Sequence, residues 1–224
     1  MSHGTHAFEA VLFDLDGTLI DSTNCIVRSM ELAFAEFGLP APSRHAIVSR
    51  MGIPLEKSVA MIEPTLENSP TCQRVIECYR AHQSALAPRM VTLFDGIQSV
   101  LDGLRSQGTP MAIVTSKKSG PATDNLRHLS VLDRFAALVG SDHVTEHKPH
   151  PAPALLALER LGLTPSSRVL VVGDSTFDID MGTRAGLSTC AVLWGAHDEP
   201  TLKSSNPTRI VNTPQDLLAV CTGA

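Results

Sequence analysis

The 224-residue sequence lacks several features that would assign it at once to a particular class of protein. It contains no run of Lys and Arg and its formal charge is −5, which argues against nucleic acid as the main partner. Its apolar runs are too short to span a bilayer, so we expect no membrane partner. Residues 1–9 contain no basic segment followed by an apolar stretch, and we therefore expect no secretory signal.

Cysteine spacing gives no sign of a disulfide framework or a metal-binding motif. The five cysteines are odd in number and show no CxxC spacing, so they are most simply reduced thiols of a cytoplasmic protein. Hydrophobic residues make up 43% of the chain and charged residues 18%, which is typical of a globular protein. The length suits one large domain, or a core domain with a smaller companion.

Predicted strands and helices alternate along most of the chain. Short apolar runs predict strands at 10–13, 111–114, 137–139, 169–172 and 189–193. Helical periodicity between these runs predicts helices at 97–107, before 129, at 152–161 and at 178–185. One more short strand and helix are predicted within 209–220. This order predicts an α/β fold with a Rossmann-like parallel sheet flanked by helices. Between 22 and 87 the pattern is helical without a convincing strand.

The helical stretch predicts an inserted all-helical domain. We expect a core domain formed by 1–20 and 90–224, and a helical cap domain formed by 21–89. The insertion begins just beyond Asp14-Leu15-Asp16-Gly17-Thr18, which directly follows the first strand. It is therefore placed to act as a lid that excludes water from a site at that strand end.

Two carboxylates, Asp14 and Asp16, lie one residue apart at the carboxyl end of this first strand, where open α/β sheets bind ligands. Burying two unpaired carboxylates is costly, so the pair implies a compensating cation. Gly17 permits a tight turn, and Thr18 offers a hydroxyl near the carboxylates.

Later strands also end in polar residues. Because the carboxyl ends of parallel strands share one edge of a sheet, residues far apart in the sequence are expected to meet there. These residues are found in Thr115-Ser116-Lys117, in the loop around Lys148, and in Gly173-Asp174-Ser175 with Asp178 close behind. Taken singly, each of these residues has a simpler explanation, such as a helix cap or a solvated lysine. Their occurrence together, at the ends of successive strands, indicates one site.

In this combination the chain resembles the haloacid dehalogenase superfamily of phosphohydrolases. The resemblance rests on four motifs that span the chain: Asp14-Leu15-Asp16-Gly17-Thr18, Val114-Thr115-Ser116-Lys117, Lys148-Pro149-His150-Pro151 and Gly173-Asp174-Ser175-Thr176-Phe177-Asp178. Gly140-Ser141-Asp142 and Leu193-Trp194-Gly195 are similar to the phosphoglycolate phosphatase-like and pyrophosphatase-like branch. The resemblance implies a core of the superfamily's α/β type with a C1-type cap.

The resemblance also implies a role for each motif residue. Asp14 would be the nucleophile that forms an aspartyl-phosphate, and Asp16 the acid and then the base. Asp14, the Asp16 backbone carbonyl and Asp174 would bind Mg²⁺, with Asp178 in support. Thr115 and Lys148 would hold the phosphoryl oxygens.

A substrate site is expected beside these residues. We expect Gly17, Ser116 and Lys117 to bind substrate, although many relatives have Asn at the place of Ser116. Arg50, in a segment that resembles the lid loop of relatives, is either a contact for a substrate carboxylate or second phosphate, or a surface arginine.

The leading hypothesis is a Mg²⁺-dependent phosphatase of a small phosphorylated metabolite, with phosphoglycolate as first candidate and inorganic pyrophosphate as second. Because Asp16 can protonate a leaving alcohol, phosphoryl transfer is favoured over carbon–halogen cleavage. The alternatives are a sugar-phosphate phosphomutase of the β-phosphoglucomutase kind, which would use the same residues, and a non-catalytic phosphometabolite sensor.

Overall fold

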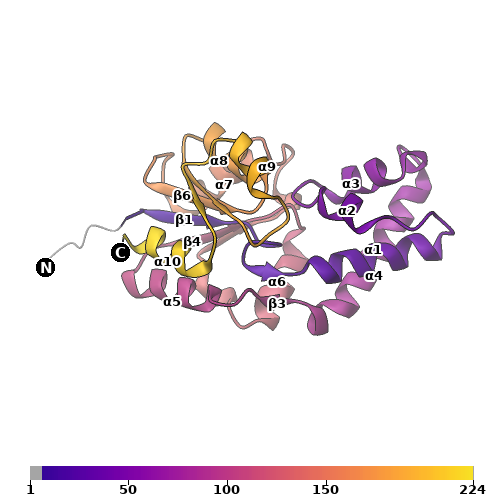
Figure 1. Cartoon of the computed structure of the whole chain (residues 1–224), viewed down its shortest axis with the longest axis horizontal. Helices are drawn as coiled ribbons and strands as arrows, with labels where there is room; N and C mark the ends of the chain where they lie inside the picture. Colours follow the sequence, from indigo (N-terminus) through magenta and orange to yellow (C-terminus); the bar gives the residue numbers. More distant parts are fainter. Residues whose placement is uncertain (1–6, 224) are drawn as a thin grey trace, which may run out of the picture.

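The computed structural model describes residues 7–223. Figure 1 shows two lobes, one built around a sheet and the other made of helices. Most of the stretch 1–9, for which no secretory signal is predicted, lies outside the described residues. Within residues 7–223 no helix combines the length and the apolar character needed to cross a membrane.

A six-stranded sheet forms the centre of the larger lobe, and every neighbouring pair of strands is parallel. The strand order is β5-β4-β1-β6-β7-β8. The bounds are β1 Ala10–Phe13, β4 Met111–Val114, β5 Ala137–Val139, β6 Val169–Gly173, β7 Ser188–Val192 and β8 Arg209–Val211. The predicted α/β class with a parallel sheet is confirmed.

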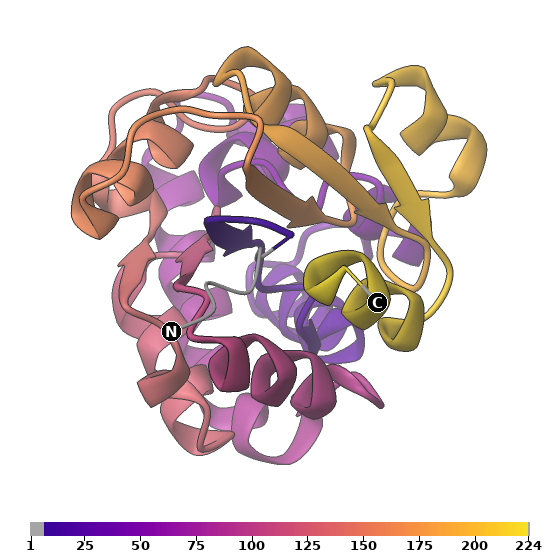
Figure 2. The same cartoon turned by 90° about the vertical axis from the view of Figure 1, so that its left-hand side faces the viewer.

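Helices cover both faces of this sheet, because its strands are apolar on both sides. Alternate residues of β1 belong to different clusters: Val11 and Phe13 face the side of α5 (Ile97–Gln107), α6 (Ser119–His128) and α10 (Pro214–Thr222). Ala10 and Leu12 face the side of α7 (Ala152–Leu161) and α8 (Thr176–Arg184). Figure 2 shows α5 and α10 on the opposite side of the sheet from α7 and α8.

The smaller lobe consists of α1 (Thr23–Glu36), α2 (Arg44–Val48), α3 (Leu55–Ile62), the 3-10 helix η1 (Pro64–Leu66) and α4 (Pro70–Met90). These helices enclose a hydrophobic cluster of their own, which includes Met30, Phe34, Val59 and Ile76. This separate cluster supports a cap domain, and the boundaries at 21 and 89 stay a prediction. We use the word cap for the lobe formed by α1 to α4.

The chain passes between the lobes twice, and the two passages pair with each other. β2 (Ile20–Asp21) and β3 (Thr92–Leu93) form a two-stranded antiparallel ribbon. This ribbon was not predicted, because two residues are too few to show a strand pattern. The short helix α9 (Glu199–Ser204) was also missed, although Asp198 and Pro200 are start signals of a helix.

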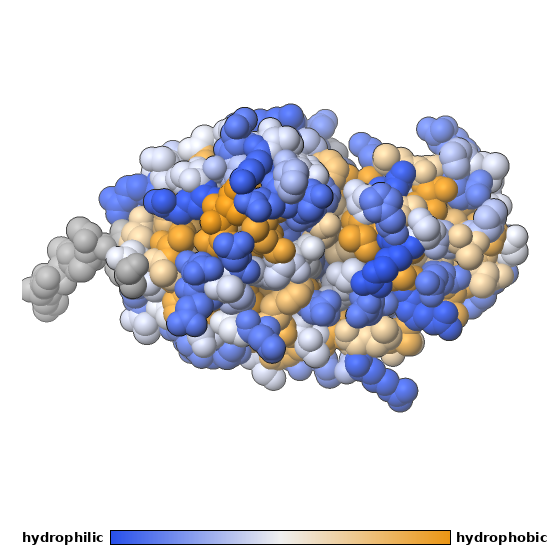
Figure 3. Space-filling view, in the orientation of Figure 1, coloured by the Kyte–Doolittle hydropathy of each residue, from blue (hydrophilic) through white to orange (hydrophobic). Residues whose placement is uncertain are grey.

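Small differences occur at the ends of predicted elements. Helix α8 begins at Thr176, two residues earlier than expected, because the Asp178 carboxylate accepts hydrogen bonds from the backbone and side chain of Ser175 and so fixes the first turn. The 3-10 helices η2 (Leu132–Arg134) and η3 (Ser141–His143) flank β5. Figure 3 shows that much of the visible face is polar, with apolar areas on both the core lobe and the cap.

Candidate active site

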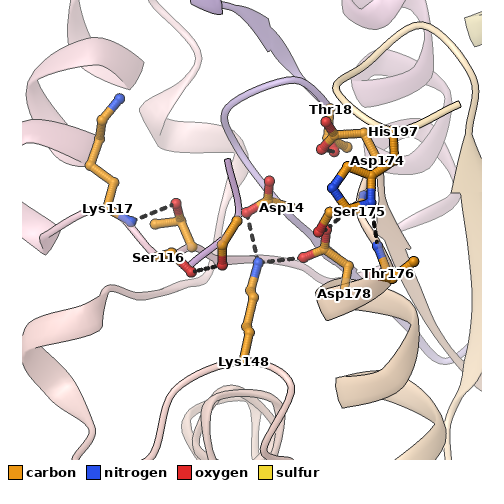
Figure 4. A network of polar contacts seen from close by, with 12 residues as sticks. Asp14, Thr18, Ser116, Lys117, Lys148, Asp174, Ser175, Thr176, Asp178 and His197 are labelled. Atoms are coloured by element: carbon orange, nitrogen blue, oxygen red, sulfur yellow. Dashed lines mark hydrogen bonds and ion pairs between the residues drawn. The ribbon is translucent and has the colours of Figure 1, made fainter. Parts of the chain in front are cut away.

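The four sequence motifs meet at the carboxyl-terminal edge of the sheet, as expected for parallel strands. Asp14 follows β1, Thr115 follows β4 and Asp174 follows β6, while Lys148 comes from the loop before α7. All four side chains belong to buried residues. Figure 4 shows Lys148 pointing between Asp14 and Asp178, with Asp174 and Thr18 beside them.

Lys148 joins two of the carboxylates directly. Its Nζ donates to Asp14 Oδ1 at 2.7 Å and to Asp178 Oδ1 at 2.5 Å. Only 1% of the Lys148 side chain is exposed, so these ion pairs lie out of water. Burial lowers the pKa of Lys148, but the charges of Asp14 and Asp178 outweigh burial and raise it above its usual range. Lys148 is therefore a fixed positive charge at this site.

Three carboxylates form a compact acidic group around this single lysine. Oxygen atoms of Asp14, Asp174 and Asp178 all lie within 4.8 Å of one another, and all three residues are buried. Burial raises the pKa of Asp174 to about 7, with the charge of Asp178 adding to the effect. Burial likewise raises the pKa of Asp14 well above its usual value, against the opposing effect of Lys148.

This acidic group fits a divalent cation. When all three carboxylates are ionised, Lys148 neutralises one of the negative charges and leaves two uncompensated in a buried place. Carboxylate oxygens are the ligands that Mg²⁺ prefers. The raised pKa values of Asp14 and Asp174 are the expected consequence of a site whose positive charge is incomplete.

Asp174 is held in place by both of its carboxylate oxygens. The Thr18 hydroxyl donates to Oδ1 at 2.9 Å, and the Ala196 backbone N–H donates to Oδ2 at 2.7 Å. Glycine is required on both sides, because a Cβ at Gly17, where φ is +90°, or at Gly195 would overlap the Asp174 carboxylate. Gly17 therefore lies against an acidic side chain, and its predicted contact with substrate stays a prediction.

The loop after β7 contributes to the site more than the sequence indicated. The Trp194 Nε1 donates to the Thr18 carbonyl at 3.0 Å, and the His197 backbone N–H donates to the Asp174 carbonyl at 3.2 Å. The Leu193-Trp194-Gly195 stretch directly after a core strand was a usable signal for this loop. The role of Ala196 carried no signal, because it acts through its backbone N–H, while the His197 side chain also contributes, with Nδ1 accepting the Thr176 backbone N–H at 3.2 Å.

Asp16 lies apart from the acidic group, and its carboxylate has a different set of partners. Its Oδ1 accepts hydrogen bonds from the Ser22 hydroxyl at 2.6 Å and from Lys117 Nζ at 2.6 Å. The Asp16 and Lys117 side chains are 15% and 8% exposed, so this ion pair is largely shielded from water. No sequence pattern indicated this pairing, and the predicted contact of Lys117 with substrate stays a prediction.

The loop before α3 brings the cap onto the core motifs. The Ser116 hydroxyl donates to the Gly52 carbonyl at 2.6 Å, which ties the second motif to the cap. A Cβ at Gly52, where φ is +95°, would lie 2.9 Å from the Ser175 hydroxyl, so the loop passes close to the fourth motif as well. The structure thus places Ser116 at the contact between the lobes.

A cavity lies between the cap and the sheet edge. It has an empty volume of about 840 Å³, part of it open to solvent. Asp14, Asp16 and Thr115 line it on the core side, with Ser116 and Lys117. Arg50 lines it on the cap side, where its Nη1 donates to the Ala46 carbonyl at 2.8 Å and to the Ser49 hydroxyl at 3.3 Å.

The family model for haloacid dehalogenase-like hydrolases matches residues 11–192, which include all four motifs. The chain belongs to this family. It is 34% identical over 208 residues to a protein named probable phosphatase IndB from Dickeya dadantii, covering 91% of this chain and 89% of that protein. It is 35% identical over 210 residues to the putative pyrophosphatase PpaX of Clostridium perfringens, covering 94% and 95%.

A solved structure supports the same family assignment for this haloacid dehalogenase-like hydrolase. The haloacid dehalogenase-like hydrolase from Streptococcus pneumoniae superposes with a TM-score of 0.83 at 30% identity, covering 95% of this chain and 98% of that one. The predicted family and the predicted class of enzyme, a phosphatase, are thereby confirmed.

Proposed function

We propose that the chain is a Mg²⁺-dependent phosphatase that cleaves a phosphate monoester through an aspartyl-phosphate on Asp14. The observation that carries this proposal is the grouping of Asp14, Lys148, Asp174 and Asp178 at one sheet edge, where Asp14 lines a cavity together with Asp16 and Thr115. Nucleophile, fixed cation and metal-binding carboxylates are the set that phosphoryl transfer needs.

In the first step an Asp14 carboxylate oxygen attacks phosphorus, and the bond from phosphorus to the ester oxygen breaks. Lys148 contacts Asp14 Oδ1 at 2.7 Å, which leaves the second oxygen available for attack. The Lys148 charge favours the ionised form of Asp14, which is the nucleophilic form. It also attracts the anionic phosphoryl group to a buried carboxylate.

Asp16 is assigned the proton transfers of both steps. As an acid it gives a proton to the leaving alcohol; as a base it then takes a proton from the water that attacks the aspartyl-phosphate. The second attack breaks the bond from phosphorus to Asp14 and releases inorganic phosphate, so the enzyme returns to its starting state. Support comes from the position of Asp16, which lines the cavity and is oriented by Ser22 and Lys117.

The phosphoryl oxygens need donors as their charge changes. Thr115 Oγ1 accepts the Lys117 backbone N–H at 3.1 Å, so its own hydrogen is free to donate to a phosphoryl oxygen. Asp14, Asp174 and the Asp16 backbone carbonyl would hold Mg²⁺, with Asp178 in support. A bound Mg²⁺ would supply positive charge that screens the two anions from each other and stabilises charge on the phosphoryl oxygens.

The test is phosphate release from a panel of phosphoglycolate, pyrophosphate, sugar phosphates and nucleotides, with Mg²⁺ and with EDTA. We expect release only with Mg²⁺. Asp14→Asn should lower kcat by about 10⁴-fold or more, because removing a nucleophile disables the whole catalytic set, while circular dichroism shows an unchanged fold. Sugar 1-phosphate to 6-phosphate conversion without phosphate release would identify a phosphomutase instead, and no turnover at all a sensor. The cytoplasmic location stays a prediction.

A further inference from the structure

The cap side of the cavity differs in character from the catalytic side. The group that leaves as an alcohol must lie beyond Asp16, between the catalytic carboxylates and the cap. Apolar side chains from α1, α2, α3 and the loop between α2 and α3 line this part, namely Ile26, Met30, Ile47, Met51, Ile53 and Leu55. An alcohol part that occupies this region loses contact with water and gains contact with apolar side chains.

The charged groups of the cap that line the cavity already have partners in the protein. Arg80 forms an ion pair with Glu56 at 2.8 Å. The Arg50 Nη1 is engaged by the Ala46 carbonyl at 2.8 Å. Among the polar cap groups, the Gln83 amide donates to the Tyr79 hydroxyl at 2.8 Å. A second anionic group on the substrate would have to break the Arg80 contact to bind that side chain, whereas the Arg50 Nε makes no hydrogen bond within the described residues.

On the core side, two lysines likewise form ion pairs with carboxylates of the protein. Lys117 is paired with Asp16 at 2.6 Å, and Lys148 lies between Asp14 and Asp178. Lys118 also lines the cavity, but it is exposed to solvent, where a charge contributes little to binding. The cavity thus offers cations at the phosphate end and an apolar wall at the other end.

Resting on the proposed function, we propose that the physiological substrate is a phosphate monoester whose alcohol part is largely apolar and longer than two carbons. The empty volume of about 840 Å³ includes space open to solvent, and the apolar side chains named above line the cap side of this space. Phosphoglycolate and pyrophosphate carry a second anionic group close to the phosphoryl group and would leave the apolar wall in contact with water.

A series of n-alkyl phosphates tests this inference, because ethyl, butyl and hexyl phosphate have leaving alcohols of nearly equal basicity. Chain length then changes only the apolar contact. We expect kcat/KM to rise about fourfold for each methylene that the wall buries. We also expect hexyl phosphate to exceed both phosphoglycolate and pyrophosphate in kcat/KM.

Ile53→Asn tests the wall itself. Ile53 lines the cavity, is only half-buried and belongs to none of the hydrophobic clusters of the core or cap, so the variant should fold. We expect kcat/KM for hexyl phosphate to fall about fivefold or more, with ethyl phosphate changed less than about twofold. The matched control is Met61→Gln on α3, since Met61 is 56% exposed and does not line the cavity; it should leave both values unchanged.

Failure of this inference and failure of the proposed function give different results. A flat dependence on chain length, or faster turnover of phosphoglycolate or pyrophosphate than of hexyl phosphate, would overturn the inference and leave a phosphatase. Preference for a hexyl phosphate with a carboxylate at its far end over hexyl phosphate itself would support the apolar wall and would in addition assign Arg50 to an anion. No phosphate release from any ester, including p-nitrophenyl phosphate, would overturn both.

Discussion

Replacing Asp174 by Asn should make the metal-free protein more stable at neutral and basic pH. The substitution removes one buried negative charge and keeps the shape of the side chain. The amide oxygen can still accept from the Ala196 N–H, and the amide nitrogen can donate to the Thr18 hydroxyl, so both present contacts find a counterpart. The effect should therefore report charge rather than packing.

The magnitude follows from the pKa of Asp174, which burial raises from 3.8 to about 7 in the folded protein. Between these values the folded state binds the proton more tightly than the unfolded state does, so without metal the stability contributed by Asp174 falls as pH rises. The loss is complete above about pH 7. At 1.36 kcal/mol per pH unit it amounts to roughly 4 kcal/mol, an order-of-magnitude figure.

Urea unfolding in EDTA at about pH 5 and pH 8 measures this difference. We expect Asp174→Asn to exceed the unsubstituted protein in free energy of unfolding by about 4 kcal/mol at pH 8 and by about 1.5 kcal/mol at pH 5. Adding Mg²⁺ should shrink the difference at pH 8 by up to about 2.7 kcal/mol, the stabilisation that an ion at a hundred times its Kd gives the folded state, because the variant has lost a ligand.

Three results would refute this reasoning. If the difference in free energy of unfolding between the two proteins in EDTA is the same at pH 8 as at pH 5, the Asp174 carboxylate does not titrate between these values. If Mg²⁺ stabilises the two proteins equally, Asp174 is not a ligand. A variant that is less stable at both pH values would show that its hydrogen bonds, rather than its charge, decide the outcome.

Other substitutions probe the remaining charged groups. Asp16→Asn should slow turnover of alkyl phosphates by about 10²–10⁴-fold but affect p-nitrophenyl phosphate far less, because that leaving group needs little protonation; equal losses with both would contradict a role as general acid. Lys148→Met should lower the free energy of unfolding by about 3–5 kcal/mol in EDTA, since Asp14 and Asp178 lose their buried partner. Lys57→Met, at an exposed position, is the control, and similar urea midpoints for the two variants would count against a buried ion pair.

Local sequence patterns determined the framework of this fold. The strand 10–13 and the helix 97–107 were predicted with the bounds that the structure has, because apolar runs and terminal signals are properties of adjacent residues. The convergence of Asp14, Thr115 and Asp174 also followed from the sequence, since parallel strands place their carboxyl ends at one edge.

Tertiary structure alone decided the partners of these residues. The pairing of Asp16 with Lys117, the bond from Ser116 to the Gly52 carbonyl and the backbone N–H at Ala196 that holds Asp174 join residues far apart in the chain. Such contacts depend on how the cap and the loop after β7 pack on the core. They cannot be predicted from the periodicity or spacing of residues along the chain. The sequence alone determines which residues carry charge. Packing decides which charges neutralise each other and which wall of the cavity is apolar.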